Sequence, residues 1–448
     1  METLSGVDVI LSRATPFGNE TGILANGVFA PGDETRDFVA NQANILVIGA
    51  GGLGCELLKN LALSGFRNFH VIDLDTIDVT NLNRQFLFRQ KDVGRMKAEV
   101  AAEFIRTRVP GTNVEYSTCP IQEKDEEFYR QFSLVVAGLD NIKARRWLNA
   151  LLVSMVLTDE DGNIVPESII PMIDGGSEAF KGQARVILPR ISSCFECSIE
   201  SFPPQVHFPL CTVAETPRKP EHCIAYMLFA VNKALSNPEA DRIYEEFTSL
   251  FGTAKLDKDN AAHMKFIYEH ALRRAEVFNI EGVTYMLTMG VVKNIIPAVA
   301  STNAIIAAAC VNEAFKLMSW SSQSLNTYCM YNGTTGVYSY TFEYSKKPGC
   351  PVCDATEIKK IVDPDSTLQD LMDSLMSDAA LQLEKPSIAK PGLSLFIQRP
   401  ETLRQQTLPN LSKKLSELVS NGDTLSVTDP IFPFGQSVDI LIEFQVPH

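Results

Sequence analysis

The sequence predicts an α/β protein built around a mostly parallel β-sheet with helices on both faces. Three observations support this fold class. Short apolar runs of strand length recur along the first half of the chain, helical segments separate them, and a glycine-rich turn joins the first run to the first helix. Strands that alternate with helices favour a parallel sheet, because each crossover helix returns the chain to the same end of the sheet.

The first elements are a strand, a tight turn and a helix. Residues 44–49 form an apolar run that ends in glycines, and leucines at helical spacing continue from there to Gly65. The pattern then predicts a strand over 69–73, a helix over 96–109, strands over 114–117 and 132–139, and a strand end at 172–175. Together these segments make up the first part of the sheet domain.

The middle of the chain has a different composition. Prolines cluster from Phe202 to Pro220, and the stretch to about Gly282 is helical and charged, which predicts an inserted domain. Residues 283–318 return to a helix rich in small residues, and residues 327–344 to alternating strand signals. The sheet domain is therefore expected to be discontinuous.

The C-terminal part is a separate module after Cys353. A capping-box pattern at residues 366–369 opens a helix over 368–375, and strands are expected over 393–397, 425–427 and 438–444, which indicates a small α+β domain. We expect these boundaries: an N-terminal extension (1–40), the sheet domain in two parts (41–204 and 288–353), the inserted domain (205–287) and the C-terminal domain (354–448).

Composition excludes several classes of protein. The 448 residues carry 54 acidic against 40 basic side chains, a net charge of −14, which argues against a general binder of nucleic acid. Met1 to Phe17 lacks the pattern of a signal peptide, and the longest apolar stretch, 295–310, is interrupted and shorter than the ~20 residues of a membrane span. Ten cysteines with two CxxC pairs fit a reducing intracellular compartment, cytoplasmic or nuclear, better than a disulfide scaffold.

The glycine-rich turn is typical of a nucleotide site. Gly49, Gly51 and Gly54 match the dinucleotide fingerprint, in which glycines let the backbone approach phosphate at the start of a helix. Asp73 lies nineteen residues beyond Gly54, where an acid accepts hydrogen bonds from a ribose. These residues alone leave NAD, FAD, ATP and a purely structural turn open.

Two cations and one carboxylate extend this site towards a triphosphate. Arg84 and Lys97 follow Asp73 at spacings that allow both to converge on phosphates; otherwise both are solvated surface residues. Asp140 closes an apolar strand at the edge of the sheet where ligands bind, so it is a candidate ligand of Mg²⁺, with a helix N-cap as the alternative.

Two cysteine pairs have the spacing of a tetrahedral zinc site. Cys194 and Cys197 form one pair, Cys350 and Cys353 the other, and they flank the inserted region. Independent free thiols are the alternative. We expect a structural Zn²⁺ that ties distant segments together and contributes folding free energy.

Cys211 is the candidate nucleophile. It follows a Phe-Pro-Leu sequence, and Arg218, Lys219 and His222 lie downstream. An ordinary thiol with a pKa of ~8.5 is mostly protonated at pH 7, so a nearby cation or a conformational step is needed to activate it. From the residues alone, a small buried thiol is the favoured alternative.

In this combination the motifs resemble a known family, the activating enzymes of ubiquitin and ubiquitin-like modifiers and their bacterial relatives that adenylate sulfur-carrier proteins. Within that group the chain is most similar to the catalytic subunits that activate the Nedd/Rub type of modifier. The matching motifs, in order, are Gly-Ala-Gly-Gly-Leu-Gly (49–54), Asp-Leu-Asp (73–75), Asn-Leu-Asn-Arg-Gln-Phe-Leu-Phe (81–88), Lys97, Gly-Leu-Asp-Asn (138–141), both CxxC pairs and the Cys211 loop.

The resemblance implies an adenylation domain of the Rossmann-like, ThiF/MoeB-like type, an inserted helical catalytic-cysteine domain and a C-terminal ubiquitin-fold (β-grasp) domain that recruits a conjugating enzyme. It implies three steps: acyl-adenylate formation from MgATP, thioester formation on Cys211, and transfer to a cysteine of the conjugating enzyme. The implied ATP-binding residues are Gly49, Gly51, Gly52, Gly54, Asp73, Asp75, Asn81, Arg84, Gln85, Lys97 and Asp140, the last also binding Mg²⁺, and the implied zinc ligands are Cys194, Cys197, Cys350 and Cys353.

The chain departs from the ubiquitin-activating enzyme, which joins two adenylation domains, because it has only one. A separate pseudo-symmetric, non-catalytic subunit is therefore implied, and the expected enzyme is a heterodimer. The short inserted region favours the Nedd/Rub type; a SUMO-type activating subunit and, less well supported, an NAD or FAD oxidoreductase are the alternatives. Arg185 is expected to lie in a strand that leads to the first cysteine pair and to read the modifier's tail by repelling a basic residue, or else to be a surface salt-bridge arginine.

Overall fold

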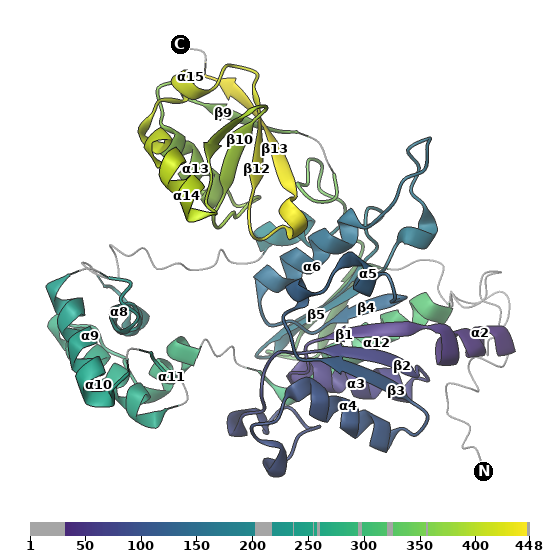
Figure 1. Cartoon of the computed structure of the whole chain (residues 1–448). Coiled ribbons are helices and arrows are strands. Elements are labelled where there is room, and N and C mark those ends of the chain that lie inside the picture. Colours follow the sequence, from purple (N-terminus) through teal and green to yellow (C-terminus); the bar gives the residue numbers. More distant parts are fainter. Residues whose placement is uncertain are drawn as a thin grey trace. The chain divides into compact units, whose positions relative to one another are not determined.

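The computed structural model describes residues 32–201, 217–235, 237–253, 255–257, 260–293, 298–319, 326–354 and 357–445. The chain forms two compact units, one made of Met1–Pro204 with Ala298–His448 and the other of Gln205–Pro297. Figure 1 shows the sheet domain and the C-terminal domain of the first unit, and the helices α8 to α11 of the second.

The sheet domain contains an eight-stranded sheet in the order β3-β2-β1-β4-β5-β6-β7-β8. Strands β1 to β5 run parallel, and β6 to β8 are antiparallel additions, so the predicted mostly parallel sheet is confirmed. The strands are β1 (Asn44–Ile48), β2 (Asn68–Ile72), β3 (Asn113–Ser117), β4 (Leu134–Ala137), β5 (Met172–Glu178), β6 (Lys181–Ile187), β7 (Tyr328–Asn332) and β8 (Tyr338–Phe342).

Helices cover both faces of this sheet (Figure 1). Ile45 and Val47 of β1 pack in the core on one face, while Leu46 and Ile48 pack in the core on the other, and all four are at most 1% exposed. Burial on both faces explains why the sequence of β1 is continuously apolar rather than alternating. The first face carries α3 (Gly52–Leu63), α4 (Lys97–Arg108) and α12 (Ala300–Ser319), the second α5 (Glu126–Tyr129) and α6 (Ile142–Ser154), and a short α2 (Asp33–Asp37) precedes β1.

Helix α6 was not predicted from the sequence, whereas β6 is the strand in which Arg185 was expected to lie. Asn141 is the N-cap of α6, where its side-chain oxygen accepts a 2.7 Å hydrogen bond from the backbone N–H of Ala144. Nearly all of α6 is buried, so its apolar residues do not repeat on one face only and the helical period is hard to see in the sequence. Strand β6 forms a hairpin with β5 rather than a new parallel unit.

The C-terminal domain contains a five-stranded sheet in the order β11-β10-β12-β13-β9. The capping box that opens its helix α13 uses Thr367 and Asp370, one position later than the sequence pattern indicated. The elements are β9 (Ile358–Val362), α13 (Leu368–Ser377), β10 (Ser387–Lys390), β11 (Leu393–Phe396), α14 (Glu401–Thr407), α15 (Leu415–Leu418), β12 (Thr424–Thr428) and β13 (Ser437–Phe444). This α+β arrangement agrees with the predicted class.

The described part of the second unit is helical, as predicted for the inserted domain. Its helices are α8 (Pro220–Val231), α9 (Pro238–Phe251), α10 (Ala261–Val277) and α11 (Tyr285–Lys293), and they share one hydrophobic core. Helix α11 packs against α8 and α10, and the predicted domain boundary at residue 287 falls within it. Cys211 lies outside the described residues.

Candidate nucleotide site and four-cysteine cluster

The candidate nucleotide site lies where the strand order of the sheet reverses. From β1 the chain proceeds outward through β2 and β3, and then returns to place β4 on the other side of β1. In parallel α/β sheets ligands bind beyond the carboxyl ends of the strands at such a reversal. The glycine turn follows β1 and Asp140 follows β4, so the topology brings these two predicted groups to the same edge.

The glycine turn is sterically constrained at two positions. A Cβ on Gly54 would lie 1.9 Å from the carbonyl oxygen of Gly49, and one on Gly49 would lie 2.8 Å from the carbonyl oxygen of Gly138. Gly49 also has a φ of +92°, which side-chain-bearing residues rarely adopt. Gly51 is the N-cap of α3 and offers no side chain to cap it, so the first N–H groups of that helix remain available to an anion.

Asp73 is fixed at the end of β2 beside this turn. Its carboxylate accepts a 2.6 Å hydrogen bond from the backbone N–H of Ala50 and a 2.9 Å bond from that of Asp75. Burial raises the pKa of the Asp73 carboxyl above its ordinary value, while Lys97 and these two hydrogen bonds act to lower it. The carboxylate is thus fixed beside the glycine turn, at the position predicted for a ribose-binding acid.

Lys97 is held by Asp75. Its ammonium group donates to the Asp75 carboxylate at 2.7 Å, and its backbone N–H donates to the Asp75 carbonyl at 2.9 Å. The Lys97 side chain is only 9% exposed, whereas that of Asp75 is 55% exposed. The alternative of a solvated surface lysine is therefore wrong, and the pair holds a buried cation at the start of α4.

Arg84, Gln85 and Asn81 are brought close to the glycine turn by a short loop. Arg84 donates to the carbonyl of Thr80 and the side chain of Asn83, both at 3.1 Å, and no acidic side chain of the described residues pairs with it. A Cβ on Gly52 would lie 3.4 Å from Cγ of Arg84, which places the arginine beside the turn. Asn81 forms a capping box with Asp78: its side-chain oxygen accepts a hydrogen bond from the backbone N–H of Asp78.

Gln85 is buried with an unused hydrogen-bonding atom. Its side chain is 3% exposed, and its Oε1 has no partner among the described residues. The amide nitrogen of the same side chain would lie 3.9 Å from a Cβ on Gly51. A buried amide with a free polar atom beside a glycine turn fits a site that a polar ligand completes.

Asp140 is exposed, and it is not the cap of α6 because Asn141 fills that position. Its carboxylate has one weak contact, a 3.3 Å hydrogen bond from the side chain of Asn141. A carboxylate with little protein partnership at the carboxyl edge of a sheet has the chemistry of an Mg²⁺ ligand.

Sequence reasoning missed two groups at this edge. Asn303 of α12 accepts a 2.5 Å hydrogen bond from Ser177, and its amide nitrogen would lie 2.5 Å from a Cβ on Gly52. Arg145 of α6 forms a buried ion pair with Asp174 of β5, with 2.9 Å between Nε and Oδ1. Neither belongs to a spacing motif, and nothing in the sequence singled them out.

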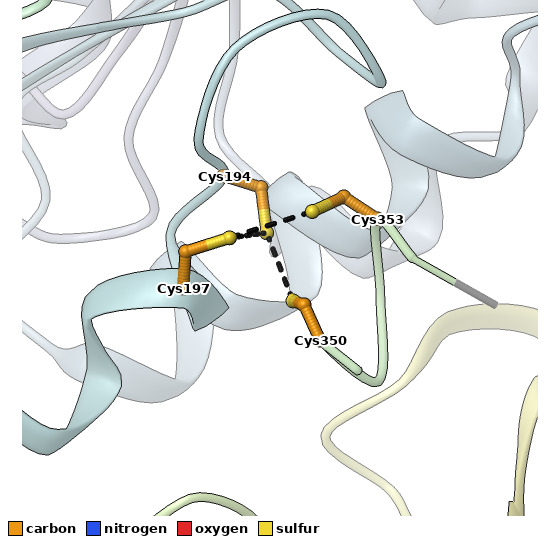
Figure 2. A group of neighbouring side chains, drawn as sticks. All are labelled: Cys194, Cys197, Cys350 and Cys353. Atoms are coloured by element: carbon orange, nitrogen blue, oxygen red, sulfur yellow. Dashed lines mark hydrogen bonds between the residues drawn. The ribbon is translucent and has the colours of Figure 1, made fainter. Parts of the chain in front are cut away.

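The two predicted cysteine pairs meet in one buried cluster (Figure 2). Cys194, Cys197, Cys350 and Cys353 are all at most 8% exposed, and their sulfur atoms all lie within 4.8 Å of one another. Three pairs of sulfur atoms are in direct contact: Cys194 and Cys197 at 3.8 Å, Cys194 and Cys350 at 3.6 Å, and Cys197 and Cys353 at 3.4 Å. Zn–S bonds of about 2.3 Å in a tetrahedron place sulfurs about 3.8 Å apart, so the cluster is compatible with zinc.

The surroundings of the cluster favour the thiolate of Cys197, whereas the contact with Cys197 raises the pKa of Cys194. The backbone N–H of Lys347 donates to the Cys197 sulfur at 3.4 Å. Hydrogen bonds from the neighbouring thiols, first that of Cys194, lower the pKa of Cys197. Metal ligation needs deprotonated sulfur, and backbone donors of this kind stabilise it.

Arg185 is buried, so the alternative of a surface salt-bridge arginine is wrong. The residue is 2% exposed, its guanidinium donates to the Ser198 hydroxyl at 2.5 Å, and it lies over the rings of Phe195 and Tyr328 at 4.9 and 5.1 Å. A contact with a modifier's tail requires this side chain to become accessible, and its predicted role stays a prediction.

The sheet topology and the glycine-turn site are those of a nucleotide-binding α/β protein, and comparison of the sequence with models of known families identifies which one. A model of the ThiF family matches residues 32–352, and a model of the E2 binding domain matches residues 361–442. The chain belongs to the ThiF family, which confirms the predicted adenylation fold and the predicted enzyme class. The second match supports an interaction of the C-terminal domain with a conjugating enzyme.

Curated relatives match nearly the whole chain. The NEDD8-activating enzyme E1 catalytic subunit of Dictyostelium discoideum is 53% identical over 98% of this chain and 96% of its own. The Drosophila melanogaster protein of the same name is 47% identical over 97% and 94%, and the Arabidopsis thaliana protein 46% identical over 93% and 87%. The solved structure of E. coli MccB with ATP covers 72% of this chain and 70% of its own at 19% identity and a TM-score of 0.43, too low to support an argument.

Among the described residues, no helix is both long and apolar enough to cross a membrane.

Proposed function

We propose that this chain is the catalytic subunit of an enzyme that activates a NEDD8-type ubiquitin-like modifier at the expense of ATP. The observation that carries the proposal is the convergence, at one edge of the sheet, of a glycine turn, a fixed aspartate, a held lysine and a free carboxylate. The three curated relatives described above are each named for NEDD8 activation, which favours this function over the SUMO-type and oxidoreductase alternatives.

In this proposal the ribose of ATP is bound by Asp73, and its phosphates lie against the N–H groups at the start of α3. Arg84 and Lys97 neutralise the phosphates. The buried Gln85 side chain, whose Oε1 has no partner among the described residues, forms its remaining hydrogen bonds with the bound nucleotide. Asp75 and Asn81 act by holding Lys97 and the loop before Arg84 in place. The free carboxylate of Asp140 holds Mg²⁺, which when bound neutralises the negative charge that develops on the reacting phosphate.

The chemistry is a sequence of two acyl transfers after activation. A carboxylate oxygen at the modifier's C-terminus attacks the α-phosphorus, the bond to the β-phosphate oxygen breaks, and pyrophosphate leaves. The thiolate of Cys211 then attacks the acyl carbon and AMP leaves, and finally a cysteine of the conjugating enzyme displaces Cys211. Fixed cations facing the phosphates lower the barrier of the first step without reorganising.

The four-cysteine cluster holds a structural Zn²⁺ in this proposal. Four sulfur ligands leave no position for water or substrate, so the metal has a structural rather than a catalytic role. It ties the segment after β6 to the segment that enters the C-terminal domain. Four zinc-binding thiolates and a thiol nucleophile suit a reducing intracellular compartment, cytoplasmic or nuclear.

Three protein partners follow from the proposal. The C-terminal domain recruits the conjugating enzyme, the adenylation domain receives the modifier, and a pseudo-symmetric non-catalytic subunit completes the heterodimer. Arg185, once accessible, discriminates among modifier tails by repelling a basic residue.

The test is modifier-dependent exchange of pyrophosphate into ATP, measured with purified modifiers and with the partner subunit present. We expect Cys211→Ala to keep the exchange and lose the reducible thioester, and Asp140→Ala to lose the exchange. A thioester that persists in Cys211→Ala rules out this nucleophile. An intact heterodimer that exchanges no pyrophosphate with any ubiquitin-like modifier overturns the proposed function.

A further inference from the structure

Arg145 is a buried cation at the edge of the nucleotide site that the proposed mechanism does not use. It lies in the first turn of α6 and is 8% exposed. One of its amino groups, Nη2, donates to two carbonyl oxygens, that of Leu139 at 2.6 Å and that of Gly175 at 2.9 Å. Its Nε lies 2.9 Å from Oδ1 of Asp174. A single guanidinium therefore contacts both the segment just after β4 and residues 174 and 175 inside β5.

These contacts begin where the backbone pairing between β4 and β5 ends. The parallel register joins Ala137 to Asp174 and goes no further. Beyond that pair, Nη2 of Arg145 links the carbonyls of Leu139 and Gly175, and so replaces the missing backbone pairing. The planar fork of arginine spreads its donors over three nitrogens and so reaches two carbonyls and a carboxylate in fixed directions, whereas the compact ammonium of lysine directs its donors from one atom.

The backbone of Asp140 is thereby fixed on both sides. On one side the N–H of Gly138 donates to the carbonyl of Ile48 at 2.8 Å, and the carbonyl of Leu139 accepts from Arg145. On the other side Asn141 caps α6. The side chain of Asp140 stays exposed with one weak hydrogen bond, so the backbone is held while the carboxylate remains available.

The positive charge of Arg145 is balanced by Asp174 and not by Asp140. Asp174 is 0% exposed, and neither of its oxygens has an aligned hydrogen-bond partner among the described residues, so the ion pair with Arg145 is what compensates its charge. The cation is therefore engaged by Asp174 and does not neutralise Asp140. Gly176 leaves the space that the guanidinium occupies, because a Cβ there would lie 3.0 Å from Nη2.

We propose that Arg145 is a positioning residue for the activation step: it holds the Leu139 carbonyl so that the Asp140 carboxylate is presented to Mg²⁺ with its charge uncompensated. This inference rests on the proposed function of the nucleotide site. Residues that orient metal ligands in this way typically change metal affinity or activity by about 10- to 100-fold when they are replaced.

The test compares Arg145→Lys with Arg146→Lys in the full heterodimer. Arg146 is the next residue of the same helix, is 3% exposed and pairs with Glu196 at 2.7 Å, so its replacement disturbs a buried ion pair of the same kind away from the nucleotide edge. We expect Arg145→Lys to raise the Mg²⁺ concentration needed for half-maximal pyrophosphate exchange by about tenfold. The KM for the modifier should stay unchanged, and Arg146→Lys should leave the Mg²⁺ requirement as it is.

Two measurements do not depend on turnover. Calorimetry of ATP binding at increasing Mg²⁺ should show the same shift, and backbone hydrogen exchange at residues 138–141 should become faster in Arg145→Lys only. If Arg145→Lys does not fold, the double variant Arg145→Met with Asp174→Asn removes both buried charges and still leaves the Leu139 carbonyl without its donor.

The outcomes separate this inference from the proposed function. An Arg145 variant with the wild-type Mg²⁺ requirement and wild-type protection of residues 138–141 overturns the positioning role, and so does an equal shift in Arg146→Lys. Absence of exchange in the wild-type enzyme overturns the proposed function instead, while the calorimetry still reports on Arg145.

Discussion

The four-cysteine cluster and the nucleotide edge belong to the same domain but are built in opposite ways. The cluster is closed: its four thiols are at most 8% exposed and contact one another. The nucleotide edge is open: Asp140 is exposed, Asp75 is 55% exposed and Gln85 keeps an unused polar atom. Side chains that contact one another in a closed cluster stabilise the folded protein. Side chains that remain exposed or unpaired, as at the nucleotide edge, make their interactions only when a ligand binds. Substitutions should therefore lower stability most at the cluster and least at Asp140.

The largest loss of stability is expected for Cys197→Ser. Loss of a structural metal ligand belongs to the few changes that cost about 4 kcal/mol or more, because the metal's binding free energy is part of the folding free energy. The free energy of unfolding and the zinc content, from denaturant titration and mass spectrometry under native conditions, should fall together. Cys119→Ser, a half-buried thiol outside the cluster, is the control and should change neither. Unchanged zinc content in Cys197→Ser would falsify the closed-site description.

The next effect is expected at the glycine turn. Gly54→Ala places a Cβ 1.9 Å from the Gly49 carbonyl, so strand and helix must move apart, at a cost of about 1 to 3 kcal/mol in the free energy of unfolding. In Gly51→Ala the new atom would meet nothing nearer than 3.9 Å, so this matched variant should lose only the preference of an N-cap for glycine over alanine, about 1 kcal/mol or less. Equal melting temperatures for the two variants would show that Gly54 does not lie against the Gly49 carbonyl as closely as the structure indicates.

A smaller effect is expected for Asp75→Asn. The ion pair with Lys97 is more than half exposed on the aspartate side, so its loss should lower the free energy of unfolding by about 1 kcal/mol or less. The KM for ATP should rise, because Lys97 is no longer held in place. The exposed pair of Lys414 with Asp365 gives the control: Asp365→Asn should alter neither quantity. If the KM for ATP is unchanged in Asp75→Asn, the ion pair of Asp75 with Lys97 has no role in nucleotide binding.

The smallest effect on stability is expected for Asp140→Asn. The side chain is exposed with one weak hydrogen bond, so the free energy of unfolding should change by no more than about 0.5 kcal/mol, while pyrophosphate exchange is lost. The neighbouring Asn141→Ala removes the cap of α6 and should cost about 1 kcal/mol. If Asp140→Asn loses as much stability as Asn141→Ala, Asp140 is a structural residue and the contrast between open and closed sites fails.

The sequence was sufficient for the residues that lie close together along the chain. Gly49, Gly54 and Asp73 form one strand, turn, helix and strand unit, so their spacing alone brought them to one edge. The two cysteine pairs were also predicted, because each CxxC spacing is specific and two pairs in one chain imply a shared site. Arg145 and Asp174 were not predicted, since they are 29 positions apart in segments with no motif.

By itself the sequence determined the class of fold, the family and the nature of the reactive groups, because short-range spacing and residue chemistry are properties of the chain. Tertiary structure decided which groups are closed and which are open. It buried Arg185 between Phe195 and Tyr328, paired Lys97 with Asp75, and left Asp140 exposed beside a buried arginine. Burial and charge pairing depend on segments far apart in the chain, and only their packing fixes which polar groups are left for a ligand.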